Sequence, residues 1–153
     1  MRVTRWGEFG ILCSLYLARK GENEAVGAAE IAEKQSIPIQ YTQQILQRLR
    51  KGGIIKSVRG PKGGYALVRS PIETTLKDIL YAAEGETFEV ICESDPVYTE
   101  KCEGRVCGLR SVWTELRTVV DDFLSKRSLA WLIENESLGF PPSEVLVPLS
   151  KAN

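Results

Sequence analysis

The sequence predicts a mainly α-helical chain with one small β-hairpin and one long helix near its C-terminal end. Three observations favour this fold class. Apolar residues recur at helical spacing in several segments, one β-branched stretch is bounded by glycines, and no apolar run reaches 18 residues. The chain has 153 residues, 43% of them hydrophobic and 26% charged. A chain of this size can bury its own core, and we expect a cytoplasmic protein with no signal peptide and no membrane partner.

The first predicted helix covers residues 6–19. Its apolar positions fall on one face of the helix and are Phe9, Leu12, Cys13, Tyr16 and Leu17. Gly21 follows, at a position where glycine commonly ends a helix. Because Cys13 stands within the apolar face, we interpret it as a small buried residue rather than a metal ligand.

Two shorter helices are predicted at residues 28–34 and 39–51, with a break at Ser36-Ile37-Pro38 between them. One side of the second helix holds Thr42, Ile45, Leu46 and Leu49, whereas amides and basic residues lie largely on the other. This arrangement is typical of a helix-turn-helix, whose second helix meets base edges through its N-terminal half. That half contains Gln40, Tyr41, Thr42, Gln43 and Gln44. Glutamine can pair with the adenine edge in the major groove, although an amide-rich face can also be merely solvated.

A basic β-hairpin is predicted directly after these helices. Residues 54–59 are rich in β-branched side chains, residues 60–64 form a glycine-rich turn, and residues 65–68 form the return strand. Residues 48–69 carry seven basic side chains, among them Arg48, Arg59 and Lys62, and no acidic one. Such a concentration attracts phosphates. The turn joins two strands and opens no helix, so a nucleotide-binding loop is disfavoured. A helix-turn-helix with a basic hairpin is a winged helix-turn-helix.

The net charge of zero conceals two oppositely charged halves. Residues 1–80 hold 13 Lys and Arg against 7 Asp and Glu, a net charge of +6, and residues 81–153 hold the reverse, a net charge of −6. Such asymmetry indicates that one half faces a polyanion and the other has a different role.

Three cysteines lie in an acidic loop predicted at residues 84–108, at the spacing C-x9-C-x4-C: Cys92, Cys102 and Cys107. Converging thiolates suit a soft metal centre. From the spacing we favour an iron–sulfur cluster over zinc, with a thiol redox switch or unliganded thiols left open. The chain has no histidine, which excludes Ser-His and Cys-His catalysis, and no other nucleophile and base stand together. We therefore do not expect an enzyme.

The long helix predicted at residues 109–123 has an apolar band wider than one stripe, which favours packing against two surfaces. We predict a dimerisation helix, with an ordinary core helix as the alternative. Its expected contacts are Leu109, Trp113, Leu116, Val120 and Phe123. The predicted divisions are a DNA-binding domain at residues 1–83, a sensor loop at 84–108, the dimerisation helix and following segment at 109–135, and an extended or disordered tail at 136–153.

Several motifs together resemble the IscR/NsrR/RirA-type bacterial transcription regulators. They are the start Met1-Arg2-Val3-Thr4, the helix-turn-helix at residues 37–49, the wing Val58-Arg59-Gly60-Pro61-Lys62-Gly63-Gly64-Tyr65, and the three-cysteine loop before a long helix. The resemblance covers about residues 1–135. It implies a winged-helix homodimer, in many members with an iron–sulfur cluster that tunes operator affinity.

The resemblance also implies roles for single residues. Cys92, Cys102 and Cys107 become cluster ligands, and Glu8 stands where some relatives supply a carboxylate from the partner subunit. Gln40, Tyr41, Thr42 and Gln44 are placed in the major groove, and Ser57, Arg59, Gly60, Pro61, Lys62, Gly63 and Gly64 in the minor groove. The gap between the first two cysteines is longer than in the best-known members, which leaves the 4Fe-4S and 2Fe-2S types open. We expect a repressor that binds a palindromic operator, with a cluster-free regulator of the same fold as the alternative.

Overall fold

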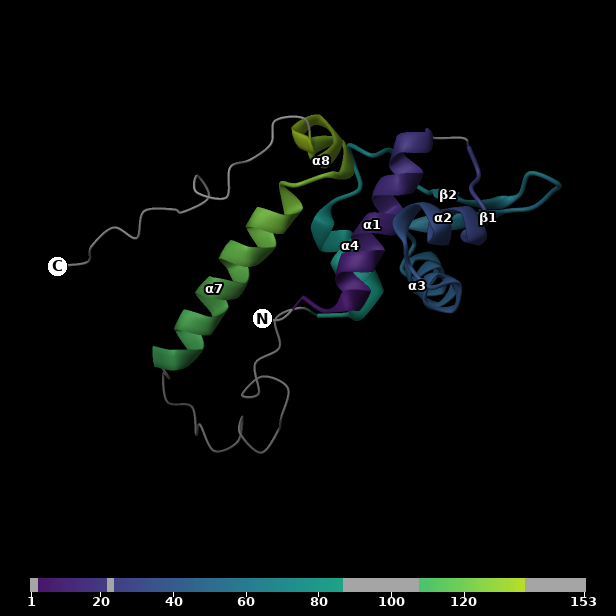
Figure 1. Cartoon of the computed structure of the whole chain (residues 1–153). Coiled ribbons are helices and arrows are strands. Elements are labelled where there is room, and N and C mark those ends of the chain that lie inside the picture. The colour runs from purple at the N-terminus through teal and green to yellow at the C-terminus, as the bar shows by residue number, and fades with distance from the viewer. Residues whose placement is uncertain (1–2, 22–23, 87–107, 137–153) are drawn as a thin grey trace.

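The computed structural model describes residues 3–21, 24–86 and 108–136, and within them six helices and two strands (Figure 1). The elements are α1 (Arg5–Lys20), α2 (Ala28–Gln35), α3 (Ile39–Lys51), β1 (Ile55–Val58), β2 (Gly64–Leu67), α4 (Leu76–Glu84), α7 (Gly108–Ser125) and α8 (Leu129–Glu136). The predicted fold class is confirmed. The predicted bounds of α3 agree with the structure, and the other predicted elements are correct to within two residues at each end.

Helix α1 lies at the centre of the fold, beside α4 (Figure 1). The two helices approach closely because α1 presents glycines to α4. A Cβ on Gly10 would lie 2.9 Å from the Cβ of Ala83, and one on Gly7 would lie 2.7 Å from Cδ2 of Leu80. The predicted single apolar face is only partly right, because Leu12 is 37% exposed whereas Leu15 and several small residues are buried.

The turn between α2 and α3 is sharp. Ser36 adopts a left-handed conformation, with φ 54°, and the N–H of Ile37 donates to the carbonyl of Ala32 at 3.0 Å. Helix α3 then packs Ile45, Leu46 and Leu49 completely into the core. The phase of the helix is thereby fixed, and its opposite side faces solvent.

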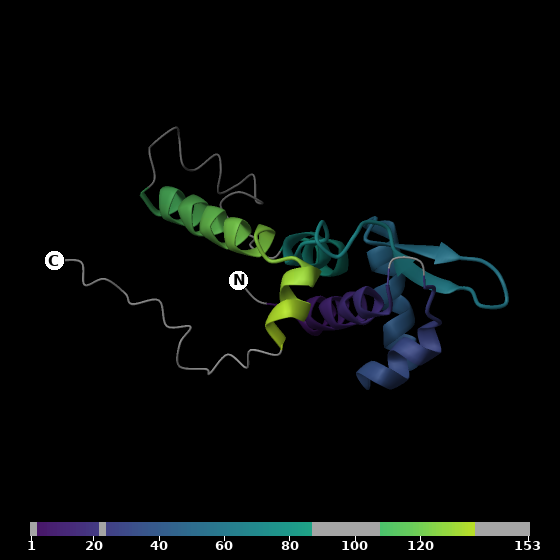
Figure 2. The same cartoon turned by 90° about the horizontal axis from the view of Figure 1, so that it is seen from above.

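The wing is an antiparallel pair in which Ile55 lies opposite Leu67 and Val58 opposite Gly64. It projects from the body of the molecule (Figure 2). Its return strand is also tied on the other edge, because Val26 and Tyr65 exchange two backbone hydrogen bonds of 2.9 Å. The hairpin is therefore anchored to the segment that leads into α2.

Helix α8 is an element that the sequence analysis missed. Leu129 is completely buried, and its N–H donates to the carbonyl of Thr74 at 2.9 Å, while the N–H of Leu76 donates to the carbonyl of Arg127 at 2.8 Å. These bonds fasten the junction of α7 and α8 to the start of α4. Helix α7, which precedes this junction in the chain, extends away from the helix-turn-helix and the wing (Figures 1 and 2), and none of its residues is buried. No helix in the described ranges is long and apolar enough to cross a membrane.

Candidate nucleic-acid interface and sensor segment

The solvent side of α3 presents a row of amides. Gln40, Gln43, Gln44 and Gln47 are all exposed, on the side of the helix away from the buried leucines and isoleucine. Each amide carries a donor and an acceptor at the end of a flexible stem, and such a pair can match a base edge. The structure thus brings these predicted glutamines together on one accessible surface.

Thr42 does not belong to that surface. Its side chain is 0% exposed, and its hydroxyl donates to the carbonyl oxygen of Pro38 at 3.2 Å. The reason is the helical phase, since Thr42 lies three residues before Ile45 and shares its inward side. The expectation that Thr42 contacts DNA is therefore wrong for this conformation.

Tyr41 and Arg48 also have contacts within the molecule. The ring of Tyr41 stacks on Trp6 with centroids 4.4 Å apart and meets Phe9 edge-on at 5.6 Å. The guanidinium of Arg48 lies 4.1 Å from the centroid of Trp6, and its Nη1 donates to the carbonyl oxygen of Ala83 at 2.9 Å. Arg48 is exposed, and only Nη1 of its five N–H donors is used in the bond to Ala83, so the guanidinium has a contact inside the protein besides its predicted place in the DNA interface.

The tip of the wing is exposed at Ser57, Arg59, Gly60, Pro61 and Lys62. The other two predicted glycines have a structural role. A Cβ on Gly63 would lie 2.5 Å from the carbonyl oxygen of Val58, and one on Gly64 would lie 2.3 Å from that of Val26. Glycine at these two positions closes the hairpin and allows it to dock beside residue 26.

Five cations of the basic stretch remain at the surface without the internal contacts just described: Arg50, Lys51, Lys56, Arg59 and Lys62. Of the other two, Arg48 binds Ala83, and Arg69 pairs with Asp78 at 3.0 Å. The attractive charge for phosphates is thus concentrated at the C-terminal end of α3 and along the wing.

The predicted cluster ligands Cys92, Cys102 and Cys107 lie outside the described residues. Within the described ranges there is no group of three or more Cys, Asp or Glu that could hold a metal ion. Glu8 is exposed in the first turn of α1. Cys13 is completely buried, and burial raises the pKa of its thiol to about 12. This burial confirms the interpretation of Cys13 as a buried residue, and its thiol is not accessible to a metal ion in this conformation.

The start of α1 and the end of α4 are joined beside Glu8. The carboxylate of Glu84 accepts hydrogen bonds from the N–H of Thr4, at 3.0 Å, and from the Thr4 hydroxyl. Thr4 is the N-cap residue of α1, where its side chain accepts from the N–H of Trp6. The candidate carboxylate ligand thus lies on a helical turn that is attached to the point where the cysteine-containing segment begins.

The exposed apolar residues of α7 form a row with alternating spacings of three and four residues: Leu109, Val112, Leu116, Val119 and Phe123. Of the predicted dimerisation residues, Trp113 and Val120 are half-buried and lie outside this row. Apolar residues at this alternating spacing form the seam of a coiled coil. We call these five residues the α7 seam.

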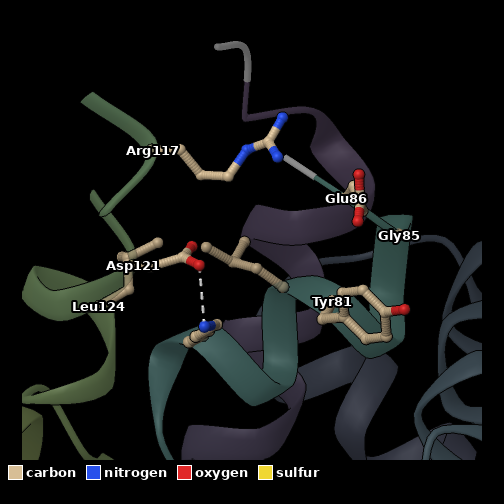
Figure 3. A pocket seen from close by; sticks show the side chains of 8 residues that line it. Tyr81, Gly85, Glu86, Arg117, Asp121 and Leu124 are labelled. Atoms are coloured by element: carbon tan, nitrogen blue, oxygen red, sulfur yellow. Dashed lines mark hydrogen bonds and ion pairs between the residues drawn. The ribbon is translucent and has the colours of Figure 1, made fainter. Parts of the chain in front are cut away.

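A pocket of about 190 Å³ lies between α4 and α7 (Figure 3). Lys77 and Asp121 pair across it, with Nζ and Oδ2 2.9 Å apart, and Arg117 extends from α7 toward Glu86. This pocket was not predicted from the sequence, because its charged residues come from two helices that are distant along the chain. Nothing in their local pattern relates them.

Comparison with known proteins finds a family match over most of the chain. Residues 3–135 match the Rrf2 family, described as iron-dependent transcriptional regulators. The chain is 32% identical over 139 residues to the HTH-type transcriptional regulator IscR of Photorhabdus laumondii. The aligned region covers 90% of this chain and 82% of that relative.

Two solved structures are similar along most of the chain. CymR, the global cysteine regulator of B. subtilis, has a TM-score of 0.71 at 27% identity, covering 88% of this chain and 97% of that one. IscR of T. potens has a TM-score of 0.71 at 26% identity, covering 92% and 93%. These relatives are regulators rather than enzymes.

Proposed function

Since the chain belongs to the Rrf2 family of transcriptional regulators, we propose that it is a homodimeric repressor whose operator affinity is tuned by an iron–sulfur cluster. The observation that carries the DNA-binding role is the surface of α3 and the wing. There, exposed glutamines that can recognise bases lie beside exposed cations that can bind phosphates.

In the proposed complex each subunit places α3 in the major groove and the tip of its wing in the adjacent minor groove. Gln40, Gln43 and Gln44 contact base edges, and Arg59 and Lys62 contact phosphates or the minor groove. Two subunits related by a two-fold axis would place their α3 helices about 34–36 Å apart, or a multiple of that distance, on a palindromic operator.

A gel shift with the upstream region of the protein's own gene tests this interface at about 150 mM salt. We expect Gln44→Ala to weaken operator binding by about 5- to 150-fold, because a good bidentate pair contributes about 1–3 kcal/mol of discrimination. Arg59→Ala is expected to weaken operator and unrelated DNA alike. Glu134→Ala, which removes an exposed side chain on α8, is the control. Unchanged operator affinity in both Gln44→Ala and Arg59→Ala would show that the proposed contacts are wrong.

The proposed dimer uses the α7 seam. Its five large apolar side chains are exposed in the single subunit, and a second copy of the helix would cover them by knobs-into-holes packing. The half-buried side of α7, with Arg117 and Asp121, remains against α4.

The donor set fits an iron–sulfur cluster: three thiolates from Cys92, Cys102 and Cys107 and one carboxylate from Glu8 of the partner subunit. Exposure of Glu8 and burial of Cys13 support this choice of residues. When bound, a cluster supplies chemistry that responds to iron supply, nitric oxide or redox state. The residues of this chain then set how strongly that response reaches the DNA-binding surface, for which allosteric coupling of about 1–3 kcal/mol is typical.

The cluster is tested by anaerobic purification, with iron and sulfide counted and absorbance recorded between about 300 and 500 nm. We expect Cys102→Ala to abolish the absorbance and Glu8→Ala to weaken or shift it. Cys13→Ala is the matched control and is expected to keep it, because that thiol is buried in the core. Wild-type protein that is colourless and free of iron would contradict the proposal.

A cluster-free regulator is the second candidate, favoured by the likeness to CymR, the global cysteine regulator, and by the charged pocket between α4 and α7. In that case operator affinity would respond to thiol oxidation, or to a small charged molecule, in colourless protein. Loss of the oxidation response in Cys102→Ser, with retained DNA binding, would support the thiol version.

A further inference from the structure

The last turn of α4 is where the DNA-binding helix, the start of α1 and the beginning of the cysteine-containing segment come together. The described chain stops at Glu86, six residues before Cys92. In the turn just before, Ala83 accepts a hydrogen bond from Arg48 of α3, and Glu84 accepts two from Thr4 at the start of α1.

The bond from Arg48 depends on the helical state of α4. Ala83 belongs to the last turn of α4, whose carbonyl groups have no partner within the helix. Arg48 supplies a donor to one of them, and a cation is favoured at the negative end of the helix dipole. A change in the position or winding of this turn would therefore act directly on Arg48.

Arg48 is in turn connected to the DNA-reading end of α3 through Trp6. The guanidinium lies over one part of the Trp6 ring system, 4.1 Å from its centroid, and Tyr41 stacks on Trp6 at 4.4 Å. Tyr41 and Arg48 are seven residues apart, two helical turns on one side of α3. Trp6 thus contacts α3 at both places, and Tyr41 directly follows Gln40 and lies two residues before Gln43.

We infer that Arg48 and Trp6 are positioning residues, which couple the last turn of α4, and with it the sensor segment, to the orientation of α3. The inference rests on the proposed function, because it assigns the route by which the sensor alters operator affinity. It also reassigns Arg48 from a phosphate contact to a contact inside the protein.

The test compares Arg48→Ala with Arg50→Ala, which removes the exposed cation two positions further along α3. The first readout is the ratio of operator affinities with and without the cluster, about 5- to 150-fold for a typical allosteric protein. We expect this ratio to fall to about twofold or less in Arg48→Ala and to persist in Arg50→Ala. Conversely, the slope of log affinity against log salt should drop by about 0.9 in Arg50→Ala and stay unchanged in Arg48→Ala.

The second readout does not involve DNA or the cluster. Amide hydrogen exchange in cluster-free protein is expected to rise at residues 39–48 and 81–86 together in Arg48→Ala, and at neither segment in Arg50→Ala. Trp6→Leu should reproduce the effect of Arg48→Ala, and Arg48→Lys should largely restore the wild-type pattern because it keeps a donor for Ala83. Trp6→Leu and Arg48→Lys also test the inference if Arg48→Ala does not fold.

The possible failures are distinct. If wild-type operator affinity does not depend on the cluster, the proposed function is wrong, and the exchange experiment still decides whether Arg48 couples α4 to α3. If wild-type protein responds but Arg48→Ala and Trp6→Leu retain the full ratio and normal exchange, the inference is overturned. A reduced salt slope in Arg48→Ala would return Arg48 to the phosphate contacts and would also overturn it.

Discussion

At the scale of single residues, glycine determines how closely the helices around the DNA-reading unit can pack. Gly52, at the end of α3, has ordinary backbone angles, with φ −79° and ψ 1°, so its conformation does not require glycine. The neighbouring atoms do require glycine at this position, because an added Cβ would lie 2.4 Å from the Cβ and 3.0 Å from the Cα of Ala82. The end of α3 is therefore held in direct contact with α4.

We predict that Gly52→Ala lowers the free energy of unfolding by about 1–3 kcal/mol, as overpacking of a tight contact does. Urea denaturation measures the loss. In Gly108→Ala, where nothing lies within 4 Å of the added carbon, no comparable loss is expected. The double variant Gly52→Ala with Ala82→Gly should be more stable than the sum of the two single effects predicts. Strict additivity would show that the two residues do not interact.

Cys13 is predicted to be unreactive in the native protein. With a pKa near 12, its thiol holds almost no thiolate at about pH 8, and thiolate is the reactive form. In a variant with Cys92, Cys102 and Cys107 replaced by alanine, a thiol reagent should modify no cysteine until denaturant is added. Rapid native labelling would contradict the burial.

The raised pKa of Cys13 also makes the stability of the protein depend on pH. As pH rises from 9 toward 12, the unfolded thiol loses its proton first, so wild-type stability should fall relative to Cys13→Ala.

At the scale of elements, the period of the hydrophobic residues and the positions of the glycines were sufficient to locate both helices of the helix-turn-helix, the wing and α7. They did not reveal α8, which is only eight residues long and directly precedes, in the sequence, the segment that contains Pro141, Pro142 and Pro148. A signal was present, since Ser128 caps the helix by accepting from the N–H of Trp131 at 3.1 Å. Leu129, Leu132 and Ile133 follow at helical spacing.

The candidate site, like the fold, was predictable from the sequence only where local helical spacing determines which residues are exposed. Spacing along α3 correctly assigned exposed positions to the glutamines, and it already placed Thr42 on the inner side. It could not show that Trp6, which lies 35 residues before Tyr41 and 42 before Arg48 in the sequence, would contact both side chains. Long-range packing decides which exposed cations are available to DNA, and a local pattern contains no information about it.

For α7 we predict that Leu116→Asp converts the proposed dimer to monomer, because the charge falls in the middle of the α7 seam and would be buried there without a partner. Analytical ultracentrifugation measures the change, and operator affinity should fall with it as the two half-sites lose their link. Thr114→Asp places the same charge on an exposed α7 position outside the seam and is expected to remain dimeric. A dimer that persists in Leu116→Asp would mean that another surface joins the subunits.

At the scale of the whole molecule, a formal charge of zero is compatible with DNA binding because the charges are separated along the chain. Five exposed cations gather on the end of α3 and the wing, whereas the cysteine-containing half is acidic. Attraction of phosphates is thereby concentrated on that part of the described surface. The acidic half would be repelled from DNA.

This separation makes the salt dependence of binding position-specific. We predict that Lys62→Ala, at the tip of the wing, reduces the slope of log affinity against log salt by about 0.9 between about 50 and 200 mM salt. Lys126→Ala removes an equally exposed cation that pairs with Asp122 on α7. It should leave the slope unchanged. Equal slopes in wild type and Lys62→Ala would exclude the wing tip from phosphate contact.

The bond pair between Val26 and Tyr65 has a consequence for the DNA itself. Because β2 is bonded to the segment entering α2, the wing is attached to the helix-turn-helix at a second point besides the chain between α3 and β1. In the proposed complex, this second attachment would fix the distance between the base pairs that α3 contacts and those that the wing contacts within each half-site. We therefore expect natural operators of this protein to differ in base identity between the two contacted regions but not in the number of base pairs separating them.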